Sequence, residues 1–399
     1  GRPIDGYTPK GCRPVDMGYN LEESLSSLAL YADISGDLNI QKAVEKALFT
    51  QLKFMLPDGG IDNSFGTRNF KWTYWGSRTS DGCGLGYLLF AKSHPEFGMA
   101  ALRNTQLLER CTHDGLLSGG PHYQKIGERS CVHHTFAHAK VLTSILDHGL
   151  ESSTYEGILP REELRGIEYF SDIDTYQIGC SGYSATITGY DWHYLKGGHA
   201  AGGAISLVWQ KDVGTVICAS MSHYQMKEPN NMQLPRFQHH ECLTPRIEYC
   251  EAGRRYSNIY DYRCSIIENQ GLFQVVGKLS DEDYMAAQAS CCNYEIQYLF
   301  EDSGFCTHIC MTDSGIYILP LISEGSESIT RTERGVLLHK KQMDIEVVIE
   351  TGTLSLPYGE ERIYHLAPGF AALKLIIVPY QGKISYGLYF RACSGQAFL

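Results

Sequence analysis

The segment Asn39–Leu56, NIQKAVEKALFTQLKFML, is followed at once by the turn Pro57-Asp58-Gly59-Gly60. Its apolar side chains recur at helical spacing on one face: Ile40, Ala43, Val44, Ala47, Leu48, Leu52 and Met55. Proline and paired glycines do not continue a helix, so the pattern predicts a helix that ends at this turn. Similar patterns predict helices over Leu21–Ile34, Ser80–Lys92, Phe97–Cys111 and Ser130–His148.

This unit of helix and glycine turn recurs. Asp114-Gly115-Leu116-Leu117 follows the expected helix Phe97–Cys111, roughly 56 residues after the first Asp-Gly turn. Another helix is expected about 20 residues beyond each Asp, at Arg78 and at His134. Such a recurrence predicts stacked helical hairpins, as in an α/α toroid or solenoid. Because only about five helices fit, we expect a partial toroid, or a native chain that extends farther towards its N-terminus.

From about Leu164 onward, short β-rich runs replace the helical pattern. Ile345, Val347 and Ile349 alternate with polar residues, and Gly, Asn or Asp usually separates the runs. The predicted strands are Ser184–Gly189, Ile205–Trp209, Val216–Ser220, Leu272–Lys278, Tyr294–Phe300, Ile316–Ile322, Ile345–Glu350, Ala372–Val378 and Tyr386–Arg391. Many strands without intervening helices indicate an antiparallel sandwich. The expected fold class is α+β and multidomain, with a partial α/α toroid over residues 1–160 and a large antiparallel β-sandwich over 161–399.

The charge balance excludes several classes of protein. Of the 399 residues, 34 are Lys or Arg and 45 are Asp or Glu, which gives a formal net charge of −11. A nucleic-acid binder masses its basic residues, and this chain has no such block. No apolar run approaches the roughly 18 residues that a membrane span requires. An anionic substrate must therefore be held by local cations in a cleft, because the overall field repels it.

Tyrosine and cysteine usage narrows the setting further. The chain has 26 Tyr, which suit stacking on sugar rings because the phenol also donates a hydrogen bond. Its 14 Cys form no CxxC motif, so most are expected to be small buried hydrophobes. No signal peptide is visible, and Gly1 is expected to be the scar of a removed leader or tag.

Histidine concentrates at the start of the expected helix Ser130–His148, at His133, His134 and His138. His134 and His138 share a helix face, but the HExxH context of a zinc site is absent. A helix N-terminus lowers the pKa of an imidazole and favours the neutral base, which suits proton abstraction near neutral pH. The alternative is that these are core or capping histidines.

Residues 189–204 are rich in aromatic and imidazole side chains and contain a glycine-rich turn. These side chains are Tyr190, Trp192, His193, Tyr194 and His199. Glycines allow the backbone to approach a ligand or to bend sharply. His199, His223 and His240 predict a zinc site, although exposed loop histidines are the alternative.

Aromatic and cationic residues also alternate in the segment 68–78. Its members are Arg68, Lys71, Trp72, Trp75 and Arg78. Indole rings and guanidinium groups supply platforms for sugars and clamps for carboxylates. Alternatively, these aromatic side chains pack the entry of the next helix.

Two of these segments resemble heparinase II/III-like polysaccharide lyases. Gly198-His199-Ala200-Ala201-Gly202-Gly203-Ala204-Ile205 looks like the HADAGSF-type strand entry of that family, and Glu128–His134 resembles its E-x-S-x-x-Y-H segment. The sequence departs from the pattern where His133 takes the place of the family's Tyr, which makes Tyr123 an alternative. It also has Gly197 where the family often has a histidine, and Ala201 at the Asp of the motif.

The resemblance implies a toroid followed by antiparallel sheets and cleavage of a uronate glycan by β-elimination. It implies Tyr and His as acid and base, an Asn or His that neutralises the carboxylate, and a structural zinc ion without an organic cofactor. The catalytic candidates are His134, His133, Tyr123, Arg78, Tyr194, His193 and His199. The candidates for substrate binding are Arg68, Lys71, Trp72, Trp75, Tyr190 and Trp192.

In this hypothesis Arg78 and His199 stabilise the enolate, His134 or a tyrosine removes the C5 proton, and Tyr123 or Tyr194 protonates the leaving oxygen. We expect a bacterial lyase of a uronate-containing polysaccharide, periplasmic or secreted, with no nucleic-acid partner. Two alternatives remain open: a glycan-binding protein without activity, and an α/α-barrel glycoside hydrolase. The hydrolase needs two carboxylates about 5–10 Å apart, and its candidates are Asp81, Glu128 and Asp191.

Overall fold

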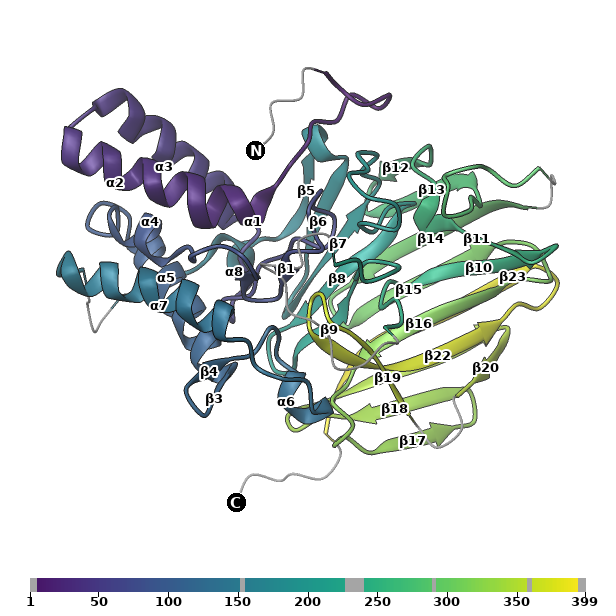
Figure 1. Cartoon of the computed structure of the whole chain (residues 1–399). Coiled ribbons are helices and arrows are strands. Elements are labelled where there is room, and N and C mark those ends of the chain that lie inside the picture. Colours follow the sequence, from purple (N-terminus) through teal and green to yellow (C-terminus); the bar gives the residue numbers. More distant parts are fainter. Residues whose placement is uncertain (1–5, 151–154, 227–239, 289–291, 357–360, 394–399) are drawn as a thin grey trace.

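The computed structural model describes residues 6–150, 155–226, 240–288, 292–356 and 361–393. Helices fill one half of the molecule and sheets fill the other (Figure 1). The helical elements are α1 (Met17–Tyr19), a π-helical turn (Asn20–Ser24), α2 (Leu25–Ser35), α3 (Leu38–Leu52), α4 (Gly84–Leu88), α5 (Pro95–Arg110), α6 (Tyr123–Ile126), α7 (Val132–Asp147) and α8 (Pro160–Glu163). The coarse prediction of an α+β protein is confirmed. No helix in these ranges is long and apolar enough to span a membrane.

Helix α3 shows how the sequence sets one element. The Asp37 side chain accepts hydrogen bonds from the backbone of Asn39 and Ile40 and so caps the N-terminus. Val44, Leu48 and Leu52 face the core, as the periodicity predicts. The predicted helix over 80–92 is shorter than expected and covers only Gly84–Leu88, in a segment where glycine recurs and lowers helix propensity.

Both Asp-Gly turns follow a helix and close a short antiparallel pairing. After α3, Met55 pairs with Ile61 across the first turn. After α5, β3 (Thr112–His113) pairs with β4 (Leu116–Leu117) across Asp114 and Gly115. Those two residues have φ of 52° and 74°, which a two-residue hairpin turn of this kind requires.

All strand pairings in the large sheets are antiparallel, and all nine predicted strands are present. A five-stranded sheet has the order β5 (Gly166–Phe170), β6 (Thr175–Gly179), β7 (Tyr183–Thr188), β8 (Ala204–Gln210) and β9 (Gly214–Cys218). A six-stranded sheet has the order β11 (Arg254–Ser257), β10 (Arg246–Glu251), β16 (Ile316–Ile322), β22 (Phe370–Val378) and β20 (Thr353–Ser355), with β21 (Arg362–His365) paired to β22. An eight-stranded sheet has the order β12 (Ser265–Asn269), β13 (Leu272–Lys278), β14 (Asn293–Glu301), β15 (Gly304–Cys310), β23 (Lys383–Ala392), β19 (Met343–Thr351), β18 (Gly335–His339) and β17 (Ile329–Thr332). A small hairpin of β1 (Trp72–Thr73) and β2 (Gly76–Ser77) lies in the helical half.

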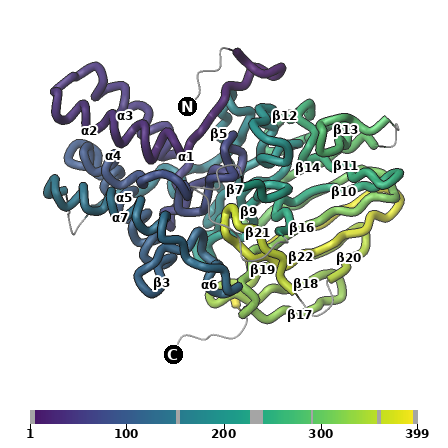
Figure 2. The backbone as a smooth tube through the Cα atoms, in the orientation of Figure 1, coloured from purple at the N-terminus to yellow at the C-terminus, as the bar shows by residue number. Residues whose placement is uncertain are grey.

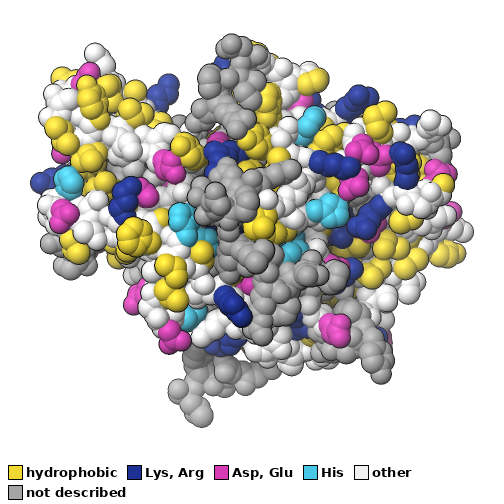
Figure 3. All heavy atoms as spheres, in the orientation of Figure 1, with side chains coloured by type: hydrophobic (Ala, Val, Ile, Leu, Met, Phe, Trp, Pro, Cys, Tyr) yellow, Lys and Arg dark blue, Asp and Glu magenta, His cyan; other side chains and the backbone are white. Residues whose placement is uncertain are grey.

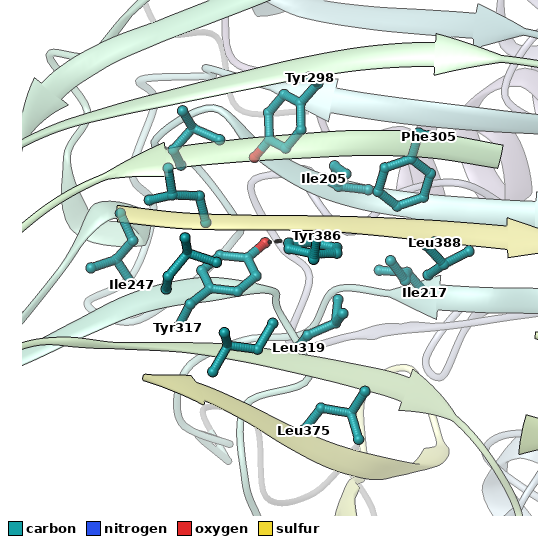
Figure 4. Close-up of a cluster of buried hydrophobic side chains, with 14 of the residues drawn as sticks. Ile205, Ile217, Ile247, Tyr298, Phe305, Tyr317, Leu319, Leu375, Tyr386 and Leu388 are labelled. Atoms are coloured by element: carbon teal, nitrogen blue, oxygen red, sulfur yellow. Dashed lines mark hydrogen bonds between the residues drawn. The ribbon is translucent and has the colours of Figure 1, made fainter. Parts of the chain in front are cut away.

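The main core lies between these large sheets. Figure 4 shows side chains from all three: Ile205 and Ile217, then Leu319 and Leu375, then Phe305 and Leu388. The alternation at Ile345 and Val347 is confirmed, since both are fully buried. The hydroxyls of Tyr317 and Tyr386 lie 3.3 Å apart within this core, so each satisfies the other where water is excluded.

The helical half packs against the five-stranded sheet, and Figure 2 shows the two lying side by side. The rings of Phe54 and Phe170 lie 4.7 Å apart across this junction. A buried ion pair lies at this junction, with Nη2 of Arg161 3.6 Å from Oδ2 of Asp62. Arg161 also donates to the backbone of Ala185, which belongs to β7.

A second junction joins the loop before α6 to the turn between β21 and β22. Backbones of Gly120 and Gly369 approach so closely that a Cβ on Gly120 would lie 2.4 Å from the Gly369 Cα. His122 N donates to the Gly369 carbonyl at 3.0 Å. Only glycine permits this approach, and it brings α6 and β21 together.

Candidate functional site

The site is built around Arg78, which follows β2 and is fully buried. Its Nη1 donates to the Tyr123 hydroxyl at 2.5 Å, and its Nε donates to the Trp72 carbonyl at 3.3 Å. Its Nη2 donates to the carbonyls of Gly119, at 3.3 Å, and Leu366. The phenols of Tyr123, Tyr224 and Tyr364 are among the groups that favour its charged form. The guanidinium is therefore committed to the protein and positions Tyr123, so it cannot form the direct carboxylate clamp expected from the sequence.

Three tyrosines surround this guanidinium: Tyr123 from α6, Tyr224 from the loop after β9 and Tyr364 from β21. The rings of Tyr123 and Tyr364 lie 6.1 Å apart. Burial raises the pKa of the Tyr123 phenol, and Arg78 opposes that rise. Of these three phenols, Tyr123 is the one that accepts a hydrogen bond from Arg78.

Two histidines complete the side contributed by the sheets. The rings of His240 and His365 lie 5.7 Å apart, and Tyr224 lies 5.4 Å from His240. Burial lowers the pKa of His365, and His240 lowers it further. Nδ1 of His365 accepts from the Ala367 N–H at 3.2 Å, so the neutral ring carries its proton on Nε2. That nitrogen is buried and has no hydrogen-bond partner among the described residues.

His134 lies near the same guanidinium from the helical side. Its ring is buried 5.9 Å from that of Trp75, in a T-shaped arrangement. Burial lowers its pKa, and Arg78 adds to the shift. The ring is neutral as expected, but burial is the first cause and not the helix N-terminus. His133 is exposed, so its side chain does not join this cluster.

The predicted segment 189–204 contributes less than expected. Tyr194 stacks on Phe70 at 6.1 Å and reaches the apolar patch next to Tyr224. His193 is exposed and packs on Tyr284 at 4.5 Å. His199 is buried. Its Nδ1 contacts the carbonyl of Ala200, and its Nε2 contacts the carbonyl of Trp192. Of the three candidates, only Tyr194 therefore approaches the Arg78 cluster.

The three predicted zinc ligands are not brought together as a set, although His223 and His240 line one cavity. His199 contacts Tyr190 and Tyr262, His223 pairs with Glu282 at 3.3 Å, and His240 lies in the cluster. Within the described ranges, no three His, Cys, Asp or Glu side chains come together to hold a metal ion. These residues do not fit a zinc site.

Most predicted sugar platforms are core residues. Trp72 and Trp75 are buried, and their indole nitrogens donate to the carbonyls of Ile61 and Ser118. Tyr190 is also buried, and its hydroxyl donates to the Arg13 carbonyl at 2.6 Å. The prediction that these rings stack on sugar is wrong, because their faces are covered by apolar side chains.

The other three binding candidates lie elsewhere. Arg68 forms an ion pair with Asp16 at 3.1 Å, Lys71 is buried, and Trp192 packs partly buried against the helical core.

Sequence reasoning missed Tyr224, Tyr364, His365 and Asn69. Asn69 is buried and donates to the Gly198 carbonyl at 2.7 Å, while its Oδ1 has no partner in the described part of the chain. It joins the front segment to the glycine-rich turn. The adjacent Tyr-His pair at 364–365, a polar pair in a strand, was the available signal.

Two cavities among the described residues bear on this cluster. One, of about 1140 Å³, is lined by Lys10, His193 and Tyr284, and Arg78 is not part of its lining. A cavity of about 430 Å³ is lined by His223 and His240, so it adjoins the cluster through the His240 ring. Figure 3 shows histidine and basic side chains on the face between the two halves.

Comparisons with known proteins place the chain among polysaccharide lyases. A sequence profile described as the ulvan lyase N-terminal domain matches residues 1–162, and one described as the ulvan lyase C-terminal domain matches residues 167–389. A broad-specificity ulvan lyase from Formosa agariphila is 36% identical over 385 residues, which cover 93% of this chain and 60% of that protein. The chain thus spans 60% of the length of this curated relative.

A solved lyase structure resembles the chain in fold. The chondroitin AC lyase of Streptomyces coelicolor, in complex with chondroitin sulphate, has a TM-score of 0.51 at 11% identity, over 98% of this chain and 55% of its own. A heparan sulfate lyase from Pedobacter heparinus has a TM-score of 0.37 at 8% identity, over 98% of this chain and 62% of its own. The expectation of a heparinase II/III-like lyase is confirmed only at the coarser level of polysaccharide lyases. The two domain profiles and the Formosa relative show that the chain belongs to the ulvan lyase family.

Proposed function

We propose that this chain carries the active site of a polysaccharide lyase that cleaves a uronate-containing glycan by β-elimination. Family membership supports the reaction class, and the name of the Formosa relative makes ulvan the first substrate to test. The observation that carries the proposal is Tyr123 bound to a buried Arg78, in a cluster that also holds His365, whose Nε2–H has no hydrogen-bond partner among the described residues. β-Elimination requires a group that transfers protons and a hydrogen-bond donor that stabilises the enolate. The phenol and the neutral imidazole supply these two functions.

Tyr123 is the acid–base residue in this proposal. Its phenolate removes the C5 proton of the uronate, or its phenol protonates the leaving oxygen. Arg78 makes the phenolate less costly without touching substrate, because its hydrogen bonds end on the protein. Arg78 is therefore a positioning residue.

His365 is proposed to receive the uronate carboxylate. Its Nε2–H points from a ring whose low pKa keeps it neutral, so it donates a hydrogen bond without adding a charge. The developing enolate oxygen is a stronger acceptor than the carboxylate in the ground state. The hydrogen bond therefore strengthens as the C5 proton leaves, which lowers the barrier.

The carboxylates favour elimination over hydrolysis. Asp81 pairs with Lys140 at the surface, and Asp191 accepts from Thr8 and from the backbone of Lys10. Of the three hydrolase candidates, only Glu128 acts on the tyrosines around Arg78. A glycosidase needs two such groups across the scissile bond.

We also propose that the helices are an arc of an α/α toroid, which the repeated helix and Asp-Gly turn support. A periplasmic or secreted location is proposed as well, because a polymer must be cut before a cell can import it. No zinc step is included, since the expected ligands do not fit a site.

The test is the ultraviolet absorbance of the unsaturated uronate product on ulvan and a panel of uronate polysaccharides. We expect Tyr123→Phe to lower kcat by about 10²–10⁴-fold in a chain that remains folded, which circular dichroism checks. Tyr380→Phe, at an exposed position, serves as the matched control. New reducing ends without the absorbance would indicate a hydrolase, and binding without either signal would indicate a non-catalytic glycan-binding protein.

A further inference from the structure

A cavity of about 430 Å³ lies where the helical half meets the edge of the five-stranded sheet, and it shares no residue with the Arg78 cluster. The Pro57–Gly60 turn and α5 form one side, and α8 and the β8–β9 hairpin form the other. Its polar and aromatic lining consists of Asp58, Arg103, Arg110, Glu162, Trp209 and Lys211. The Pro57–Gly60 turn therefore borders a cavity that takes no part in the proposed reaction.

The charges around this cavity are unbalanced in favour of cations. Among the described residues, Arg103, Arg110 and Lys211 form no ion pair with a carboxylate, and Nε of Arg103 is buried without a hydrogen-bond partner. Its two carboxylates are already engaged. Asp58 accepts from the Tyr74 hydroxyl and the Gly60 N–H, and Glu162 accepts from the Leu159 N–H. On a chain of net charge −11, this cavity offers local positive charge to an anion.

An indole forms part of the wall beside these cations. Trp209 belongs to β8, packs partly buried against the hydrophobic cluster that includes Trp75, and lines the cavity. Unlike Trp72 and Trp75, it is not fully buried. An aromatic face next to guanidinium and ammonium groups suits a sugar ring that carries a carboxylate.

The wall is held rigidly before any ligand binds. Gly59 has a φ of 89°, and a Cβ there would lie 2.3 Å from the Arg103 carbonyl oxygen, so the turn rests directly on α5. Asn104 of α5 also holds the turn, because its Nδ2 donates to the Gly59 carbonyl at 2.9 Å. A preformed site loses little entropy on binding.

We propose that this cavity is a second, non-catalytic glycan site that binds an acidic sugar residue of the polysaccharide. Trp209 stacks on the sugar ring, and Arg110 and Lys211 pair with its carboxylate. A polymer held here raises the effective concentration of its other units at the Arg78 cluster. The proposal goes beyond the reaction itself, because binding at this site requires no turnover.

The test is calorimetric titration of the full chain with a short glucuronate oligosaccharide, in the Tyr123→Phe background to prevent cleavage. We expect the pair Arg110→Gln and Lys211→Gln to lose one equivalent of binding, or to weaken it about tenfold. Both side chains are exposed, so the pair leaves the fold intact. Lys42→Gln, an exposed lysine on α3, is the matched control and keeps the full stoichiometry.

A second measurement follows tryptophan fluorescence during the same titration. The ligand changes the emission, and Trp209→Leu removes that change. Equal stoichiometry and affinity in the paired variant, or equal binding of a neutral cello-oligosaccharide, would overturn the proposal. A site that binds inorganic sulfate but does not bind the oligosaccharide would also overturn the proposal. Failure of the lyase assignment is recognised separately, by the absence of the unsaturated product from the unaltered protein, and failure of the Tyr123 assignment by unchanged turnover in Tyr123→Phe.

Discussion

Nη1 of Arg78 donates a hydrogen bond of 2.5 Å to the hydroxyl of Tyr123, and both side chains are fully buried. The partners come from different parts of the helical half, and the Leu366 carbonyl from the sheets accepts from both. The shared Leu366 carbonyl therefore joins the two halves at the point where we place the proton transfer. The hydrogen bond from Arg78 also sets the free energy of the phenolate, which a buried phenol otherwise disfavours.

Replacing this cation should move the pH dependence of the reaction. Arg78 lowers the pKa of Tyr123 against the effect of burial, so Arg78→Gln raises that pKa further. If the phenolate is the base, the rising limb of the kcat profile shifts to higher pH, and kcat at neutral pH falls. Arg78→Lys keeps a positive charge and should shift the limb less. Identical profiles in both variants and in the unaltered protein would remove Arg78 from the mechanism.

The donor role of His365 predicts a split between kcat and KM. His365→Phe removes the Nε2–H, and we expect kcat to fall by about 10²–10³-fold while KM changes little, because the hydrogen bond matters most at the enolate. His365→Gln retains an N–H donor and should recover part of the rate. Steady-state kinetics on the polymer measures both. A change confined to KM would show that His365 binds substrate without stabilising the enolate.

The ion pair of Asp62 and Arg161 predicts a large effect on folding. Both side chains are buried, with Nη2 and Oδ2 3.6 Å apart, and burial disfavours the charge of each. Asp62→Ala leaves the guanidinium uncompensated and should lower the free energy of unfolding by about 3–5 kcal/mol. Asp172→Ala breaks the exposed pair with Arg13 and should cost less than about 1 kcal/mol. Denaturant unfolding of both variants gives the comparison.

The buried histidine His138 predicts a loss of stability in acid. Burial lowers its pKa to about 4 in the folded chain, whereas an unfolded histidine titrates near 6.5. The unfolded state therefore binds the proton first, and stability falls as the pH drops from about 6.5 to 4, by about 3 kcal/mol for this group. His134 and His365 are shifted in the same direction. Between pH 6.5 and 4, the free energy of unfolding should therefore depend less on pH in His138→Asn. His148→Asn, at the exposed end of α7, is the control.

Residue types in the sequence predicted part of the site, but they did not identify all of its members. Arg78, Tyr123 and His134 were predicted because a cation, a phenol and an imidazole suit elimination, and the fold brings them together. Tyr364 and His365 were missed because they belong to β21. That strand is brought to the site only by its pairing with β22 and by the contact of Gly120 with Gly369. Pairings of that kind join residues far apart in the chain, and local patterns do not register them.

The sequence by itself determined the order of the elements, since helical and strand periodicities are local properties of the chain. It also determined that the chain is acidic and that Asp114-Gly115 forms a tight turn. Only the tertiary structure decided which rings face solvent: it buried Trp72 and Trp75 in the core and left part of Trp209 at a cavity. It likewise separated His199 from His240. Burial depends on which distant segments pack over a side chain, so composition and spacing cannot specify it.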